Sequence, residues 1–167
     1  MPIYVIYARA KAANFKLEHE GFYGAKTGRL LQKIDKALPG KHTRKMYNSL
    51  NRADAAILAH LRTNISRLNT YLQKIKITET DKCECGGVET IPHFLFLCPR
   101  WRDQRRDMRT AHGNRLWSIS YAVGGYSDHV ENGKKVDGEK DKWRPDWKAV
   151  RTTIEFAKAT GRLQRQT

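Results

Sequence analysis

Three cysteines and one histidine form the motif with the clearest chemical potential in this 167-residue chain. They follow the pattern C-x-C-x7-H-x4-C and are Cys83, Cys85, His93 and Cys98. Three thiolates and one imidazole form a closed set of four ligands, which suits a structural zinc ion and leaves no position for a substrate. Two glycines, Gly86 and Gly87, follow the first pair and allow the tight turn that would direct both sulfurs to one point. The motif therefore predicts one structural zinc ion.

The spacing between the last two ligands constrains the backbone. His93 and Cys98 are five residues apart, which on a continuous α-helix is about 140° of rotation. The two side chains would then not share a face. Pro99 disfavours helical geometry at the residue before it. We therefore expect Cys98 to lie where the helix ends or unwinds, with residues 94–97 forming an apolar wall.

An alternative is that the cysteines are ordinary buried thiols and the histidine a core residue. The chain has three cysteines, and an odd count without a secretory signal argues against a disulfide framework. The first apolar run, residues 3–8, has no basic region before it, so it does not have the form of a signal peptide. No run approaches the ~20 apolar residues that a membrane span needs. We therefore expect an intracellular, reducing location, in the cytoplasm or, given the basic charge of the chain, in the nucleus, and no membrane partner.

The charge of the chain indicates a polyanionic partner. There are 32 Lys and Arg residues against 17 Asp and Glu, giving a formal net charge of +15. A basic excess of this size is typical of proteins that bind nucleic acid and, as the second candidate, an anionic membrane surface; nucleic acid is the expected partner.

A group of arginines directly after the motif could contact phosphates. Four of them are spaced at i, i+3, i+4 and i+7, and Arg100 precedes them. The four are Arg102, Arg105, Arg106 and Arg109. On one helix they would form a single basic stripe able to bind nucleic-acid backbone. The alternative is a solvated face with local pairing to Asp103 and Asp107, and the net charge favours phosphate contact.

Apolar spacing and capping residues predict a mainly α-helical fold. The expected helices cover residues 27–38, 43–50, 51–63 and 66–75, a segment starting at 99, and a last helix capped by Asp146 and stopped by Gly161. The helix at 51–63 is apolar on most of its circumference, which is typical of a central helix. Trp143 and Trp147 are expected to anchor the last helix on the others. The fold class is therefore a small helical bundle with a Cys/His zinc-binding insert, a flexible loop and a C-terminal helix.

The same features divide the chain into four parts. Residues 1–26 form an unassigned N-terminal arm, and residues 27–123 form the helical bundle with the zinc-binding segment 83–98. Residues 124–142 are rich in glycine and charge, which predicts a flexible linker or exposed loop. Residues 143–167 form the C-terminal helix and its tail.

Motifs for catalysis are missing from the sequence. It has no Asp-Asp dipeptide of the kind that holds two magnesium ions in polymerases. It also has no G-x-S-x-G, Walker A or G-x-G-x-x-G motif, and no zinc-deaminase pattern. A closed four-ligand metal site offers no bound water to activate. We therefore expect that the chain is not an enzyme.

Several short segments together resemble one protein family. They are residues 37–43, 57–58, 61–63, 68–69, 71–72, 83–86, 93–101, 124–126 and 154–163. From about residue 30 onward the chain resembles the C-terminal tail of fungal non-LTR (LINE-type) retrotransposon polyproteins, downstream of the reverse transcriptase and ribonuclease H domains. The resemblance implies a zinc-binding segment at Cys83, Cys85, His93 and Cys98, and a role in handling template RNA or target DNA. Residues 1–26 match nothing in that family.

The leading functional hypothesis is a non-catalytic, zinc-stabilised module that binds RNA or single-stranded DNA, with retrotransposon polymerase domains as a second partner that the resemblance implies. A second hypothesis is a structural or protein-interaction module in which zinc only holds the bundle together. A third, a remnant of reverse transcriptase or ribonuclease H activity, is disfavoured because their catalytic motifs are missing.

Overall fold

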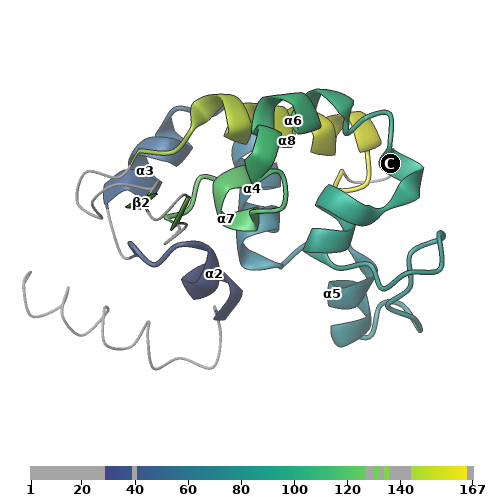
Figure 1. Ribbon diagram of the computed structural model, residues 1–167. Helices are drawn as coiled ribbons and strands as arrows, with labels where there is room; N and C mark the ends of the chain where they lie inside the picture. Colours follow the sequence, from purple (N-terminus) through teal and green to yellow (C-terminus); the bar gives the residue numbers. More distant parts are fainter. Residues whose placement is uncertain (1–28, 39–40, 127–129, 132–133, 136–143, 165–167) are drawn as a thin grey trace, which may run out of the picture.

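The structure is a computed structural model that describes residues 29–38, 41–126, 130–131, 134–135 and 144–164 (Figure 1). The fold is mainly helical, as predicted. In chain order the elements are α2 (Arg29–Ile34), α3 (Lys41–Asn48), α4 (Arg52–Thr63), α5 (Asn69–Lys74), the π-helix η1 (His93–Leu97), the 3-10 helix η2 (Pro99–Trp101), α6 (Arg106–His112), the 3-10 helix η3 (Gly113–Arg115), α7 (Ile119–Ala122), the antiparallel strands β1 (Val130–Glu131) and β2 (Lys134–Lys135), and α8 (Trp147–Thr160).

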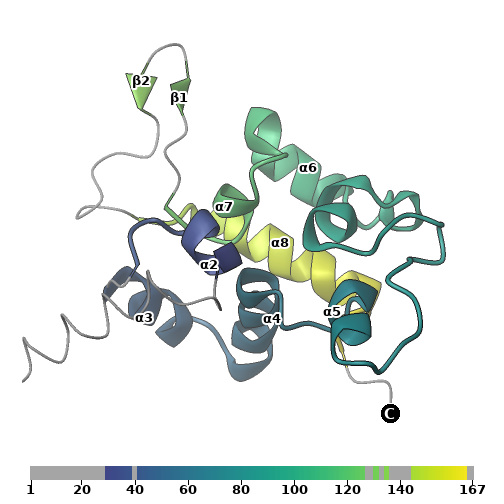
Figure 2. The same ribbon diagram turned by 90° about the horizontal axis from the view of Figure 1, so that it is seen from below.

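Helix α8 is the centre of the bundle, and α4, α6 and α7 all pack against it (Figure 2). Its ends agree with the predicted caps. The Asp146 side chain accepts a hydrogen bond from the Ala149 N–H at 3.0 Å, and Gly161 ends the helix at a left-handed φ of 64°. Trp147 packs against the core, which confirms its predicted role as an anchor, whereas Trp143 lies outside the described residues.

Helix α4 has the predicted bounds but not the predicted central place. The Asn51 side chain caps it by accepting from the Asp54 N–H at 2.9 Å. One face is buried through Leu58 and Leu61, but Ala53 on another face is exposed. The apolar character that suggested a central helix therefore belongs partly to an open face.

The first part of the bundle contains a buried ion pair. Helix α2 ends at Ile34, so the predicted helix to residue 38 is too long, and Thr27 lies outside the described residues. Asp35 turns inward there and accepts from Arg62 Nη2 at 2.6 Å, while Arg62 Nη1 donates to the Val123 carbonyl at 2.8 Å. His42 Nε2 lies 2.9 Å from the same carboxylate. Burial raises the pKa of Asp35, but hydrogen bonds and charges from His42 and Arg62 outweigh it and lower the pKa overall.

Two glycines of the predicted linker belong to the core. A Cβ on Gly124, whose φ is 68°, would lie 2.8 Å from Met46 Sδ, and one on Gly125 would clash with the Ile34 carbonyl. Tyr126 is also buried. Composition predicted a linker from residue 124, but this close packing, which only glycine permits, places 124–126 inside the bundle. Residues 127–129, 132–133 and 136–143 lie outside the described residues.

Within the described part of the chain, the helices are too short and too polar to cross a lipid bilayer.

Candidate metal centre

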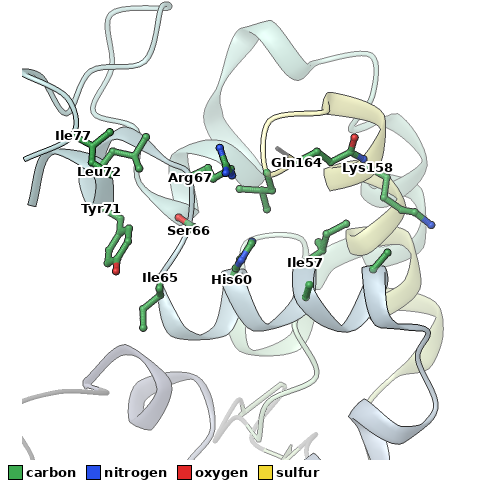
Figure 3. Close-up of a pocket in the computed structure, with 13 residues that line it drawn as sticks. Ile57, His60, Ile65, Ser66, Arg67, Tyr71, Leu72, Ile77, Lys158 and Gln164 are labelled. Atoms are coloured by element: carbon green, nitrogen blue, oxygen red, sulfur yellow. The ribbon is translucent and has the colours of Figure 1, made fainter. Parts of the chain in front are cut away.

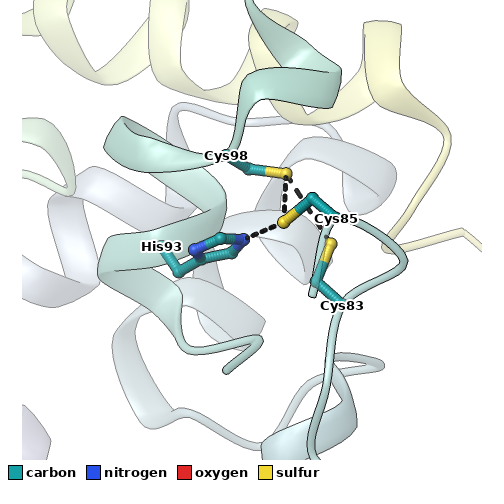
Figure 4. Close-up of side chains that lie close together, drawn as sticks. All are labelled: Cys83, Cys85, His93 and Cys98. Atoms are coloured by element: carbon teal, nitrogen blue, oxygen red, sulfur yellow. Dashed lines mark hydrogen bonds between the residues drawn. The ribbon is translucent and has the colours of Figure 1, made fainter. Parts of the chain in front are cut away.

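The four predicted ligands converge at one end of the molecule, on the side of α5 (Figures 1 and 4). Cys85 Sγ lies 3.2 Å from His93 Nε2, Cys83 Sγ 3.6 Å from Cys98 Sγ, and Cys85 Sγ 3.8 Å from Cys98 Sγ. All four ligand atoms lie within 4.8 Å of one another. A tetrahedral zinc ion at its usual bond lengths would separate its sulfurs by about 3.8 Å and a sulfur from a nitrogen by about 3.5 Å. The geometry therefore fits one tetrahedrally bound metal ion.

A tight turn presents the first two sulfurs. Lys82 and Val88 form an antiparallel bridge, and between them the Gly86 N–H donates to the Cys83 carbonyl at 2.8 Å. Gly86 has a φ of 89°, which favours glycine. A Cβ on Gly87 would lie only 2.8 Å from the His93 ring. The glycine pair therefore gives both the turn and the room for the histidine ligand.

A π-helical turn presents the other two ligands. The Cys98 N–H donates to the His93 carbonyl at 2.8 Å, five residues back, and Cys98 itself is extended, with a ψ of 121°. This wider turn brings residues five apart closer to one face than an α-helix does. The structure thus confirms that the helix unwinds at Cys98. Phe94 is fully buried, whereas Leu97 is 60% exposed and does not contribute to the expected apolar wall.

The surroundings of the ligand side chains shift their pKa values in different directions. A hydrogen bond from the Gly87 backbone is the main cause that lowers the pKa of the Cys85 thiol, which favours the thiolate. Burial lowers the pKa of His93 and so favours the neutral imidazole that binds metals. Burial instead raises the pKa of Cys98 to about 11. The positive charge of a bound ion is therefore needed to hold Cys98 as a thiolate at neutral pH.

Arg100 lies beside the centre. Its Nη1 donates to Cys83 Sγ at 3.9 Å, its Nη2 pairs with Glu84 at 2.7 Å, and its guanidinium lies 4.8 Å from the centre of the Trp101 ring. Such contacts stabilise a negatively charged metal–thiolate group. Arg100, which sequence analysis assigned to nucleic-acid contact, is already engaged at the metal centre.

Arg105 differs most from its prediction. It is 4% exposed and donates to the carbonyls of Leu95, Cys98 and Phe94 at 2.6, 2.9 and 3.2 Å. The predicted basic stripe required one continuous helix from residue 99. Instead the chain forms the short helix η2 and then a turn, and α6 begins only at Arg106. Arg105 therefore satisfies the open carbonyls around the π-turn and is not available to a phosphate.

The other three arginines of the stripe, Arg102, Arg106 and Arg109, are exposed. Arg106 Nε lies 4.0 Å from Asp107, and both side chains are more than four-fifths exposed, so this pair contributes little. The local pairing considered as an alternative is thus weak at Arg106.

We expect Arg105→Gln to weaken metal binding about 10- to 100-fold, because it removes the donors that hold the Cys98 carbonyl in place. The exposed neighbour provides the control: Arg106→Gln removes the same charge and should leave metal affinity unchanged. Competition with a chromogenic chelator measures both affinities. Equal affinities in the two variants would show that the buried hydrogen bonds do not position the ligands.

The sequence analysis did not identify the residues that connect the metal centre to the helical bundle. Glu89 is 2% exposed and accepts from the Asn69 N–H at 2.7 Å and from Arg162 Nη2 at 2.6 Å. Arg162 directly follows the glycine that ends α8, so Glu89 joins the metal-binding segment to both α5 and α8. No local pattern could have revealed this contact, since the two residues of the ion pair are 73 positions apart.

Comparisons of the chain with protein-family models, with curated proteins and with solved structures found no match, so the resemblance to retrotransposon polyproteins rests on the short segments quoted above.

Proposed function

We propose that the ion is zinc and that its role is structural. Thiolate and imidazole ligands in a compact tetrahedral arrangement are the usual donors of structural zinc sites. Cys83 and Cys98 are buried, and the four protein ligands leave no coordination position for water. We therefore assign no catalytic step to this centre. No disulfide joins the three cysteines in the described residues, and cysteines that serve as metal ligands fit a reducing, intracellular location, nuclear or cytoplasmic.

We further propose that the chain is a non-catalytic module that binds RNA or single-stranded DNA. One observation carries this proposal: Arg102, Arg106 and Arg109 are exposed in the segment that directly follows the ligand Cys98. The ion fixes the start of that segment, and the net charge of +15 favours a polyanionic partner. The resemblance to retrotransposon tails is consistent with such a role and implies polymerase domains as a second partner.

Replacing these three arginines by glutamine should weaken binding to a short single-stranded RNA and flatten its dependence on salt. Each phosphate contact contributes about 0.7 to the slope of log affinity against log salt concentration, so the slope should fall by about 2. Fluorescence anisotropy of a labelled RNA across a salt series measures both quantities.

The matched control removes the same charge from the opposite end of the molecule. Lys41, Arg44 and Lys45 are exposed on α3, which lies away from the metal centre in both views (Figures 1 and 2). Their replacement by glutamine should change affinity less and leave most of the slope. Equal effects of the two triple variants would indicate diffuse attraction without a defined site. A wild-type chain that does not bind RNA at low salt would favour the structural or protein-interaction alternative.

A further inference from the structure

A second surface, separate from the metal centre, has the character of a docking groove. It is about 680 Å³ in volume and lies between α4 and α5, with the turn after α8 at one side (Figure 3). Its apolar lining includes Ile57, Ile65, Tyr71, Leu72, Ile77 and Leu163. Side chains on α4 and on α5 face the same space from two sides. Neither the proposed zinc site nor the proposed nucleic-acid contact uses this groove.

Two large apolar side chains at the rim of the groove are highly exposed. Six large hydrophobic residues of the described chain are exposed, and Ile65 and Ile77, at 57% and 67%, both line the groove. Ala53 and Ala56 on the adjoining face of α4 are exposed as well. Exposed apolar residues gathered around a groove mark a binding surface rather than a random scatter. An enclosed small-molecule pocket would instead place its apolar residues inside.

The charge of the groove indicates what kind of partner fits. Its lining contains no Asp or Glu, and its two permanently charged residues are Arg67 and Lys158. Lys158 is paired with Asp54 and Glu155, each at 3.0 Å, whereas Arg67 forms no ion pair with any residue that the structure describes. Burial and the Arg67 charge lower the pKa of His60, so this residue is neutral at neutral pH. The groove therefore presents one unpaired positive charge beside an apolar floor.

We propose that this groove binds an amphipathic helix of a partner protein, with its apolar face on the groove and an acidic residue at Arg67. Binding of the apolar face of an amphipathic helix in a hydrophobic groove is a recurring mode of peptide recognition. A second copy of the chain fits less well, because two chains of net charge +15 repel each other and bring no acidic excess to Arg67.

The test begins with selection of binders from a random peptide library displayed on phage, using the full metal-loaded chain. The counter-selection uses the Ile65→Asp/Ile77→Asp variant. Its two positions are more than half exposed, so we expect this variant to fold like the wild type, which circular dichroism checks. We expect the selected peptides to be acidic and to carry apolar residues at helical spacing. Measured as synthetic peptides by anisotropy, they should bind this variant at least about tenfold more weakly.

A control variant separates the groove from general attraction to a basic protein. Ile75 is 44% exposed and close in sequence to the groove but does not line it. Ile75→Asp should therefore leave peptide affinity nearly unchanged, and Arg67→Gln should reduce it mainly for acidic peptides. The proposal is overturned if the selected peptides bind the double variant and the wild type equally. It is also overturned if the selection yields no peptide or only basic peptides.

Two further outcomes would assign the groove to another occupant. A dimer in sedimentation equilibrium that dissociates in the Ile65→Asp/Ile77→Asp variant would show that a second copy fills it. Displacement of a selected peptide by a synthetic peptide of residues 1–28 would indicate that the chain's own N-terminal segment binds in the groove. Either outcome contradicts a partner helix, and neither bears on RNA binding, which the arginine variants test separately.

Discussion

Cys85→Ser is expected to abolish stoichiometric metal binding and to lower the stability of the chain by more than ~2.7 kcal/mol, which is the contribution of a ligand present at 100 times its dissociation constant. Of the three cysteines, Cys85 is the best to replace because it is only half-buried, so serine at this position leaves little packing defect. The loss of a thiolate then leaves three ligands. Thermal unfolding with and without a strong chelator measures the effect.

The chelator serves as an internal control for that variant. It should lower the melting temperature of the wild type towards that of Cys85→Ser and leave the variant itself unchanged. A histidine outside the cluster gives a matched substitution: His60→Gln should behave like the wild type, since the His60 side chain faces the groove. If the chelator destabilised Cys85→Ser as much as the wild type, the ion would have to be bound elsewhere.

Asp35→Ala is expected to destabilise the bundle by about 3–5 kcal/mol, because it leaves the Arg62 guanidinium buried without a counter-ion. The side chain of Arg62 is 1% exposed and that of Asp35 is fully buried, so water cannot replace the lost partner. The carboxylate also accepts from the N–H groups of Ala37 and Tyr126, each at 3.2 Å. For a domain of this size the melting temperature should fall by about 10 °C.

An exposed ion pair supplies the comparison for this prediction. Glu155 is 65% exposed and pairs with Lys158 on the surface of α8, so Glu155→Ala should change stability by less than about 1 kcal/mol. Denaturant unfolding of both variants, with metal present throughout, gives the difference. A similarly small loss of unfolding free energy in both variants would mean that the buried ion pair contributes no more to stability than an exposed one.

Local signals made much of the fold predictable. The caps of α4 and α8 depend on Asn51, Asp146 and Gly161, each acting within a few residues of the helix end it caps. The metal centre was predictable for a similar reason, because C-x-C and H-x4-C bring their ligands together through short backbone turns. Pro99 even indicated that the helix would unwind before it, although the π-helical form of the turn was not expected.

Contacts across long distances in sequence were not predictable. Arg105 matched a surface stripe by spacing, yet the carbonyls left open by the π-turn bind it inside the molecule. The Arg62–Asp35 pair joins residues 27 positions apart, and no pattern distinguishes a buried arginine from a surface one. Gly124 and Gly125 resembled a linker in composition, because a glycine required by close packing looks the same in sequence as one in a loop.

The open face of α4 illustrates the same limit. Its apolar residues predicted burial, and the structure leaves part of α4 lining a groove together with α5. A sequence pattern records which faces are apolar but not which partner covers them. The groove and the metal centre both border the segment from α5 to Cys83, so the proposed partners would bind near a region whose geometry a bound ion would help to fix.

The most direct test of the account is the metal content of the full-length protein, purified without added metal or chelator and measured by elemental analysis. We expect one zinc ion per chain in the wild type and less than about a tenth of that in Cys85→Ser, because loss of a ligand should cost at least the roughly 10- to 100-fold in affinity that loss of an outer-shell partner costs. A wild-type chain that is folded by circular dichroism and contains no metal would contradict it. The four residues would then be ordinary packing groups of a basic helical protein.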